Sequence, residues 1–395
     1  MGSARPRRFS RSLSVALLAS LATLTAGCSQ GGNEIVVNVE EPPDYNPTGS
    51  PTGSPDSTSP STGSSSPSAA SDGQPQVLET IAEDLEVPWG LAFLPGGDAI
   101  VTERDSARVL RINGTAYGVT EVGTIGEAAP QGEGGLLGVA VSPDFANDKL
   151  LYFYLSSAKD NRIVTARLNG KTLSKTKPLL TGIPLGAIHD GGRMVFGPDG
   201  LLYVSTGETG DPELAQDTKS LAGKILRLTP DGEPAPGNPL GTEPWSFGHR
   251  NVQGLAFTDD EALWASEFGQ STFDELNRIE GGGNYGWPDF EGEGGAAEGF
   301  IDPQAVWGTD VASPSGLAFA DGALWMAALR GNRLWKIPLD DNGDAEQPQA
   351  FFVGEYGRMR TVTTAPDGTL WLTTSNLDGR GNPVDGDDRI LRIQP

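Results

Sequence analysis

The chain has 395 residues, a formal net charge of −24 at pH 7, one cysteine and two histidines. So acidic a surface repels the phosphate backbone of nucleic acids and anionic lipid headgroups, which argues against nucleic acid as a partner. A single cysteine allows no intramolecular disulfide, and two histidines are too few for a histidine-rich metal site.

The first segment of the chain has the composition of a bacterial export signal. Four arginines between residues 5 and 11 precede the apolar run LSVALLASLATLTAG at 13–27, which ends at Cys28. Basic residues followed by a short apolar run that ends in small residues predict a secretory signal rather than a membrane-spanning helix. Because LTAGC resembles a bacterial lipobox, residues 1–28 are expected to be a lipoprotein signal peptide with Cys28 lipidated. A plain signal peptide cleaved nearby is the alternative.

Residues 29–76 are rich in serine, threonine, proline and glycine, as in PTGSPTGSPDSTSPSTGSSSPSAAS. A segment with so few apolar side chains cannot offset the entropy lost on ordering, so it is expected to be a flexible linker. These two segments together predict a protein that is secreted across the cytoplasmic membrane and held on its outer side by the lipid anchor alone.

Residues 77–395 contain six copies of one pattern: an apolar alternating run, a turn of proline, aspartate or glycine, and a second apolar run. The copies are WGLAFLPGGDAIVTE, LGVAVSPDFANDKLLYFY, RMVFGPDGLLYVST, QGLAFTDDEALWAS, SGLAFADGALWMAA and RTVTTAPDGTLWLTT. Such alternation around Asp-Gly or Gly-Gly predicts β-hairpins. The turns are marked by Pro95, Pro143, Pro198, Asp259, Asp321 and Pro366, which lie 45 to 62 residues apart.

A repeat of this length, built of short strands without amphipathic helices between them, predicts an all-β, six-bladed β-propeller. The residues before the first marker and after the last together amount to one further repeat. We therefore expect VLETIAEDL at 77–85 to complete the last blade beside DRILRIQP at 388–395. A pair of β-sandwiches is the alternative fold, and the regular spacing disfavours it.

Polar side chains occupy the same place in five copies, 8 to 10 residues before the turn marker. They are Glu133, His189, Arg250, Ser313 and Arg358. This place lies on the loop that enters the innermost strand of a blade, so these side chains are expected to converge on one funnel. Arg193, Arg330 and Arg360 add guanidinium groups, which bind carboxylates as planar forks. The funnel is therefore predicted to bind a small polyanion; for any single arginine, a surface ion pair is the alternative.

His189 is the candidate base of this funnel. Neighbouring arginines disfavour the imidazolium form, so His189 is expected to remain an unprotonated base near neutral pH. Such a base can take a proton from a hydroxyl group, as oxidation of an alcohol or hemiacetal requires. The chain has no GxGxxG between a strand and a helix, so a redox function would need a cofactor other than a nicotinamide. His249 is expected to orient the loop of Arg250.

The ordered motifs of residues 77–395 resemble the glucose/sorbosone dehydrogenase family, soluble aldose sugar dehydrogenases that use pyrroloquinoline quinone (PQQ). The motifs are VPWGLAFLP, GEGGLLGVAVSPDF, HDGGRMVFGPDGLLYVSTGE, LAGKILRLTPDG, GHRNVQGLAF, DELNRIEGGGNYGWP, SPSGLAF and GRMRTV. The resemblance implies a six-bladed propeller and a PQQ- and Ca²⁺-dependent oxidoreductase. Its substrates would be aldose sugars, oxidised at the anomeric hydroxyl to lactones, and its electrons would pass to an external quinone or cytochrome.

The resemblance also implies a role for individual residues. His189 matches the general base that removes the proton of the anomeric hydroxyl while hydride passes to PQQ. Contacts to PQQ would come from Glu133, Arg250, Asn251, Gln253, Arg330, Arg358 and Arg360. One Ca²⁺ would bind the backbone carbonyls of Gly269 and Gln270, and a second, structural Ca²⁺ would involve Glu275 and Tyr285.

Four positions differ from what is common in the family. Glu133 stands where some members have glutamine, Gln270 where many have proline, and Arg330 where lysine is frequent; Thr361 replaces an acid. These differences bear on substrate range and cofactor affinity rather than on the fold. Two other functions stay open: a non-catalytic propeller lipoprotein that binds a ligand or a protein, and a Ca²⁺-dependent lactonase. The lactonase would need acidic metal ligands at the centre of the channel.

Overall fold

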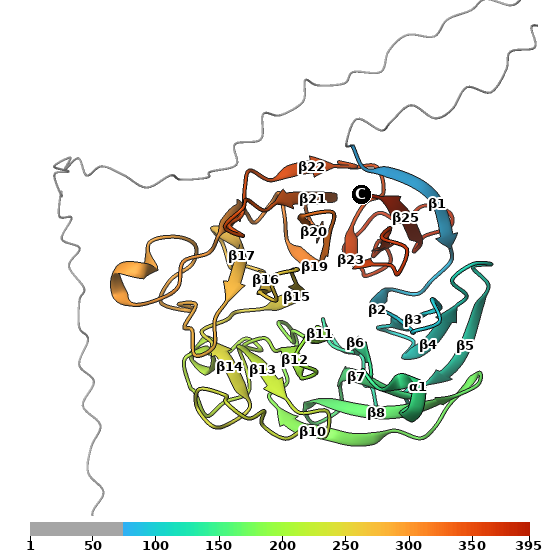
Figure 1. Cartoon of the computed structure of the whole chain (residues 1–395), viewed down its shortest axis with the longest axis horizontal. Helices are drawn as coiled ribbons and strands as arrows, with labels where there is room; N and C mark the ends of the chain where they lie inside the picture. The colour runs from blue at the N-terminus through green and yellow to red at the C-terminus, as the bar shows by residue number, and fades with distance from the viewer. Residues whose placement is uncertain (1–73) are drawn as a thin grey trace, which may run out of the picture. The chain divides into compact units, whose positions relative to one another are not determined.

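The computed structural model describes residues 74–395; the predicted signal peptide, Cys28 and most of the predicted linker lie outside the described residues. The described part consists of six antiparallel sheets arranged in a ring, each with four strands on its main path (Figure 1). The six-bladed β-propeller predicted from the repeats is confirmed. Within residues 74–395, no helix is long and apolar enough to cross a membrane.

Each blade runs from an innermost strand at the channel to an outermost strand at the rim. The strands of blade 1 are β2 (Pro88–Phe93), β3 (Ala99–Glu103), β4 (Arg108–Ile112) and β5 (Val119–Thr124). Those of blade 2 are β6 (Leu136–Val141), β7 (Leu150–Ser156), β8 (Asn161–Asn169) and β10 (Lys177–Ile183), with the short β9 (Thr172–Leu173) beside β8 and helix α1 (Phe145–Asp148) between β6 and β7. Those of blade 3 are β11 (Met194–Phe196), β12 (Leu202–Ser205), β13 (Lys224–Leu228) and β14 (Pro244–Phe247), with the 3-10 turn η1 (Pro212–Ala215).

The second half of the chain repeats this arrangement. The strands of blade 4 are β15 (Val252–Phe257), β16 (Leu263–Glu267), β17 (Phe273–Ile279) and β18 (Ala305–Gly308), with the 3-10 turn η2 (Gly295–Glu298). Those of blade 5 are β19 (Pro314–Ala320), β20 (Ala323–Ala328), β21 (Arg333–Pro338) and β22 (Gln349–Phe351). Those of blade 6 are β23 (Met359–Thr364), β24 (Leu370–Thr374), β25 (Ile390–Gln394) and β1 (Gln76–Ala82).

The ring is closed by the first strand. Strand β1 pairs antiparallel with β25, with Gln76 opposite Gln394 and Ala82 opposite Ile390. The predicted pairing of the N-terminal segment with the last strand is therefore confirmed. Closing the ring with the two ends of the domain in one sheet leaves no blade without a neighbour on either side.

The core lies between the blades rather than within them. Six clusters of buried apolar side chains each join neighbouring sheets, as where Trp264 and Trp307 of blade 4 meet Leu317 and Trp335 of blade 5. The repeated glycine of the innermost strands lets adjacent strands approach at the centre. A Cβ on Gly254 would lie 2.4 Å from the backbone oxygen of Ser315. Small residues at the channel and large ones between the sheets thus shape the ring.

The antiparallel order of each blade decides which loops form the site. The loop that enters the first strand and the loop that leaves the second strand open on the same face of the ring. Most residues that line the central cavity lie on these two kinds of loop, and Gln253 and Arg360 lie at the start of the innermost strands β15 and β23.

Candidate active site

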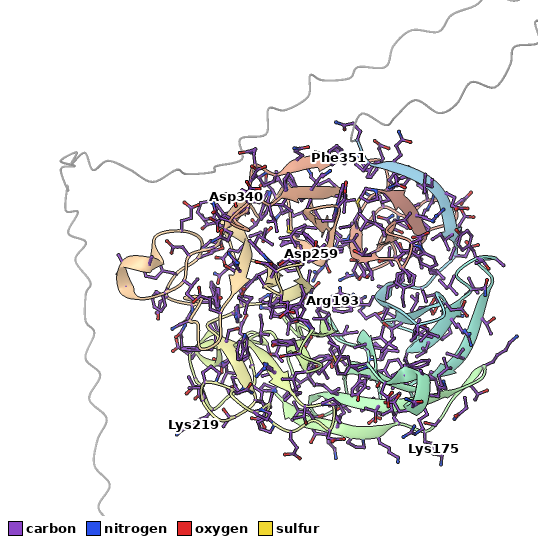
Figure 2. The ribbon with its side chains drawn as sticks, viewed as in Figure 1. Lys175, Arg193, Lys219, Asp259, Asp340 and Phe351 are labelled. Carbon is purple, nitrogen blue, oxygen red and sulfur yellow. The ribbon has the colours of Figure 1, made fainter. Side chains whose placement is uncertain are left out.

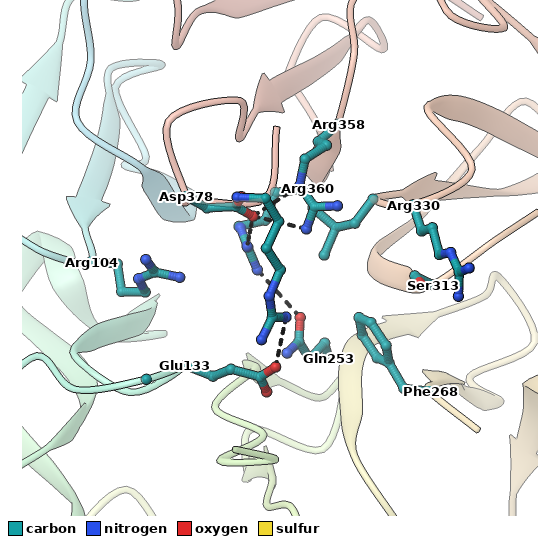
Figure 3. Close-up of a pocket in the computed structure, with 12 residues that line it drawn as sticks. Arg104, Glu133, Gln253, Phe268, Ser313, Arg330, Arg358, Arg360 and Asp378 are labelled. Atoms are coloured by element: carbon teal, nitrogen blue, oxygen red, sulfur yellow. Dashed lines mark hydrogen bonds and ion pairs between the residues drawn. The ribbon is translucent and has the colours of Figure 1, made fainter. Parts of the chain in front are cut away.

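A cavity of about 330 Å³ opens on this face at the centre of the ring. Its volume falls within the range of about 300–1,000 Å³ that is usual for sites that bind small molecules. The lining comes from five blades and consists of Arg104, Gly132, Glu133, Gln253, Phe268, Ser313, Leu329, Arg330, Arg358, Arg360, Asp378 and Arg380 (Figure 3). Of the side chains predicted to converge on one funnel, Glu133, Ser313, Arg330, Arg358 and Arg360 line this cavity, as does the predicted cofactor contact Gln253. His189, Arg193 and Arg250 were also predicted to lie there but are not part of its lining.

The funnel carries more positive than negative charge. Five arginines line it against two carboxylates, Glu133 and Asp378. Asp378 accepts hydrogen bonds from Arg358 (2.9 Å) and Arg360 (3.0 Å) through one oxygen. Burial opposes ionisation of this carboxyl group, but Arg360 and Arg358 hold its pKa below the ordinary value. An excess of three guanidinium groups in a protein of net charge −24 indicates a site for an anion.

Glu133 links the funnel to the loop of His189. One of its oxygens accepts a hydrogen bond from Arg380 (2.8 Å), and the other accepts the backbone N–H of His189 (3.0 Å). Although burial opposes ionisation, these two contacts keep the pKa of Glu133 below its ordinary value. The histidine loop is thereby fixed at the edge of the funnel.

His189 contacts a carboxylate rather than an arginine. Its Nδ1 is hydrogen-bonded to Oε1 of Glu208, whose side chain is buried and whose second oxygen has no hydrogen-bond partner among the described residues. A carboxylate that accepts the Nδ1 proton leaves Nε2 free to act as a base. The neighbour of His189 is therefore a glutamate where arginines were expected, and this histidine–glutamate pair was not predicted from the sequence.

The backbone around His189 explains the glycines of the motif. His189 has a φ of 58°, in the left-handed region, and a Cβ on Gly207 would lie 1.8 Å from the His189 carbonyl oxygen. The two loops can approach this closely only because position 207 has no side chain. Asn251, a predicted PQQ contact, lies beneath this loop, where its Oδ1 accepts the N–H of Gly191 (3.1 Å), and not in the funnel lining.

His249 and Arg250 lie on the corresponding loop of blade 4. His249 is fully buried; its ring contacts Ser246 (2.8 Å) and Glu267 (2.9 Å) and stacks on Tyr285 at 4.7 Å. Glu267 also accepts the backbone N–H of Arg250. His249 thus orients the Arg250 loop through Glu267, as expected.

Arg250 lies beside the funnel and not in its lining. Its guanidinium donates to the carbonyl oxygens of Phe268 (3.2 Å) and Gly269 (2.6 Å), and its Nε is buried without a hydrogen-bond partner in the described residues. Burial lowers its pKa. A Ca²⁺ on the carbonyl of Gly269 would compete with this guanidinium, so Gly269 does not fit the ion as it stands. The role of the Gln270 carbonyl stays a prediction.

Glu275 and Tyr285 border a second, much smaller cavity. It measures about 10 Å³, which is the space of one water molecule or ion, and Glu267 and Arg250 also line it. Burial and the neighbouring Glu267 raise the pKa of Glu275. The hydroxyl of Tyr285 is engaged by Arg278 and Glu280, so only its backbone carbonyl is free to bind a metal. Two buried carboxylates side by side fit a divalent cation.

Side chains alone do not form a metal site of the usual kind. Within residues 74–395, no group of three or more histidine, cysteine, aspartate or glutamate side chains could hold a metal ion. Any Ca²⁺ ligands in this part of the chain would have to include backbone carbonyls or water, both of which are common for Ca²⁺.

Four charged residues of the site were not predicted from the sequence: Arg104, Glu208, Asp378 and Arg380. Arg104 directly follows β3, Glu208 follows β12, and Asp378 and Arg380 follow β24. All four thus lie on the loop that leaves the second strand of a blade, whereas the repeat register was used only for the loop that enters the first strand. The signal that reveals them is a charged residue at this second place in the repeat.

Comparison with known proteins places the chain in a family. A sequence model described as "Glucose / Sorbosone dehydrogenase" matches residues 85–391. An aldose sugar dehydrogenase of Escherichia coli K12 is 30% identical over 356 residues, which cover 80% of this chain and 92% of that protein.

Comparison with solved structures supports the same family assignment. The PQQ-bound aldose sugar dehydrogenase of Streptomyces coelicolor has a TM-score of 0.79 and 55% identity, covering 83% of this chain and 99% of that one. A protein of Thermus thermophilus, described as a "putative oxidoreductase (glucose dehydrogenase)", has a TM-score of 0.76 and 42% identity, covering 81% and 100%. Sequence and structure therefore lead to one conclusion: the chain belongs to the glucose/sorbosone dehydrogenase family, whose members are oxidoreductases.

Proposed function

We propose that the protein is a PQQ-dependent dehydrogenase that oxidises the anomeric hydroxyl of aldose sugars to lactones. The observation that carries this proposal is the funnel, with its excess of three guanidinium groups beside the His189–Glu208 pair. PQQ has three carboxylates, which would balance that excess. The similarity to a PQQ-bound aldose sugar dehydrogenase at 55% identity supports the same assignment.

The residues of the funnel fit such a cofactor. Arg358, Arg360 and Arg330 present guanidinium groups to one cavity, and Gln253 adds an amide. When bound, PQQ would supply the ortho-quinone that accepts hydride from the anomeric carbon. Nε2 of His189 would take the proton of the anomeric hydroxyl, while Glu208 fixes the ring and balances the charge that develops on it.

Reconstitution of the purified mature protein tests the proposal. Incubation with PQQ and Ca²⁺ is expected to give reduction of an artificial dye in the presence of aldoses, and a rise in melting temperature without sugar. A rise in melting temperature without dye reduction would support the non-catalytic alternative. If PQQ changes neither the absorbance spectrum nor the melting temperature, the proposal is wrong.

We further propose that a Ca²⁺ ion occupies the small cavity beside Glu275. Its charge would neutralise the two neighbouring carboxylates of Glu275 and Glu267. Ca²⁺ is then expected to raise the melting temperature of the wild-type protein, and the substitution Glu275→Gln to abolish most of that rise. Differential scanning fluorimetry with calcium against EGTA measures both. Glu298→Gln, at an exposed position in η2, is the control and should respond as the wild type does. An equal response of all three proteins would contradict the assignment.

The remaining parts of the proposal rest on sequence alone. We propose an external quinone or cytochrome as the electron acceptor, and attachment through Cys28 to the outer side of the cytoplasmic membrane. Metabolic labelling with a fatty acid, compared with the Cys28→Ala variant, tests the attachment.

A further inference from the structure

A single arginine spans the central channel below the funnel. Arg193 precedes β11 of blade 3 and lies at the centre of the ring (Figure 2). Its Nε donates to the carbonyl oxygen of Gln253 (2.7 Å) in blade 4, and its Nη2 donates to the hydroxyl of Thr361 (3.0 Å) in blade 6. The guanidinium also lies 4.3 Å from the ring of Trp89 in blade 1. One side chain therefore contacts three blades other than its own.

Arg193 has no counter-ion among the described residues. Only 8% of it is exposed, and both of its hydrogen-bond acceptors are neutral. Burial, and then the nearby charge of Arg360, lower its pKa to about 9, so it remains charged at neutral pH. A buried ion without an opposite charge is costly to a folded protein.

The groups above Arg193 add to this imbalance. Arg358 and Arg360 are also buried and share one carboxylate, that of Asp378. Arg193, Arg358 and Arg360 thus face a single buried carboxylate at this end of the channel, while Arg104, which is also buried, is paired with Asp105. The neighbouring protein charges do not offset the positive charge of Arg193.

Nor does the channel below supply a counter-ion from the described part of the chain. The cavity on that side measures about 450 Å³, and its walls are the innermost strands of all six blades, with Phe93, Phe257 and Phe319 among the lining residues. Of the described residues that form these walls, Arg193 is the one that carries a charge. The compensating charge must therefore come from a bound anion or from solvent.

The funnel is the better place for that anion. The backbone oxygen of Gln253 accepts a hydrogen bond from Nε of Arg193. The side-chain oxygen of Gln253 lies 3.5 Å from Nη1 of Arg360 inside the funnel. Arg193 and the funnel are thus separated by one residue, and little water can screen a charge across that layer.

We propose that Arg193 is a positioning residue for the anionic cofactor: its buried charge attracts carboxylates bound in the funnel, and its bond to Gln253 holds that residue in place. This inference rests on the proposed function. Arg193 need not touch the cofactor, since a buried charge acts over a distance that solvent would screen elsewhere.

The test compares Arg193→Met, which removes the charge, with Arg193→Lys, which keeps it. The dissociation constant for PQQ, measured by fluorescence titration without sugar, is expected to rise roughly tenfold or more in Arg193→Met. In Arg193→Lys it should stay within about threefold of the wild-type value. The melting temperature of the cofactor-free protein should not fall in Arg193→Met, because that variant loses an uncompensated buried charge.

Lys224 offers a matched control. It is fully buried, but its ammonium group donates to three backbone carbonyls, those of Leu214 (2.7 Å), Ala215 (2.9 Å) and Ala222 (2.6 Å). Lys224→Met is therefore expected to show the opposite pattern, with a lower melting temperature and an unchanged affinity for PQQ.

Three outcomes would overturn the inference. If Arg193→Met lowers the melting temperature of the cofactor-free protein and leaves the PQQ affinity unchanged, Arg193 only stabilises the packing of the blades against one another. If Arg193→Lys loses as much affinity as Arg193→Met, shape rather than charge matters. If chloride raises the melting temperature of the wild type but not of Arg193→Met, the compensating anion lies in the channel.

A redox-inactive probe separates this inference from the proposed function. Benzene-1,3,5-tricarboxylate carries three carboxylates and no quinone. If the wild type binds this compound more tightly than Arg193→Met does, the role of Arg193 toward anions stands even where PQQ does not bind. If the wild type binds PQQ and the two proteins bind it equally well, the proposed function stands and the inference fails.

Discussion

Replacing His189 with glutamine is expected to lower the turnover of aldose oxidation by roughly 10²- to 10⁴-fold, the usual contribution of a general base. The affinity for PQQ should remain close to that of the wild type, because His189 is absent from the residues that line the funnel. Steady-state kinetics with the reconstituted enzyme and fluorescence titration of PQQ measure the two quantities. Turnover near the wild-type level would show that another group takes the proton.

The left-handed backbone at position 189 calls for a second variant. Glutamine adopts a φ of 58° less readily than asparagine does. A loss of turnover in His189→Gln could therefore result from a displaced loop. His189→Asn suits this backbone and also lacks the base. Equal loss in both variants, with unchanged melting temperature, assigns the effect to the imidazole.

Glu208→Gln tests the histidine–glutamate pair. The substitution keeps the size of the side chain but removes the carboxylate that would balance the charge developing on the ring as it takes the proton of the substrate. Turnover is expected to fall, with PQQ affinity retained, because Glu208 does not line the funnel either. Glu121→Gln, on the outermost strand β5, is the control and should leave turnover unchanged. Wild-type turnover in Glu208→Gln would reduce the pair to a structural contact.

The fold could be predicted from the sequence because the repeat is local. Each copy carries its own alternating runs and its own turn, and six copies with a remainder of one repeat dictate a closed ring. The glycine before Leu-Ala-Phe in three copies also has a local reason, since the innermost strands at Gly254 and its equivalents meet at the centre. Even the pairing of β1 with β25 could be predicted, because the residues before the first turn marker and after the last together have the length of one repeat.

The site could be predicted only in part, because its contacts join loops that lie far apart in the sequence. The positions of Glu133, Arg358 and Arg360 in the repeat were enough to predict that they line one funnel. It could not show that Glu208 contacts His189 or that Arg193 spans the channel to Thr361, 168 residues away. The neighbours of a charged group determine its chemistry, and those neighbours are known only once the blades are assembled.

Arg358 and Arg360 are expected to dominate the affinity for PQQ. A hydrogen bond to a charged group contributes about 1.5–3 kcal/mol, so replacing both arginines with methionine should raise the dissociation constant by roughly 10²- to 10⁴-fold. Arg330→Met serves as the comparison within the same cavity. Its guanidinium is exposed and forms no ion pair among the described residues, so its loss should weaken binding less.

The double variant has a second consequence that must be separated from the first. Removing both arginines leaves the buried carboxylate of Asp378 without its partners, which costs about 3–5 kcal/mol of folding stability. Adding Asp378→Asn removes that charge, so the triple variant should recover the melting temperature of the cofactor-free protein while its PQQ affinity stays low. Fluorimetry without cofactor and titration with PQQ separate the two effects. If the triple variant regains PQQ affinity along with stability, the arginines serve to hold the loop of Asp378 and do not bind the cofactor's carboxylates.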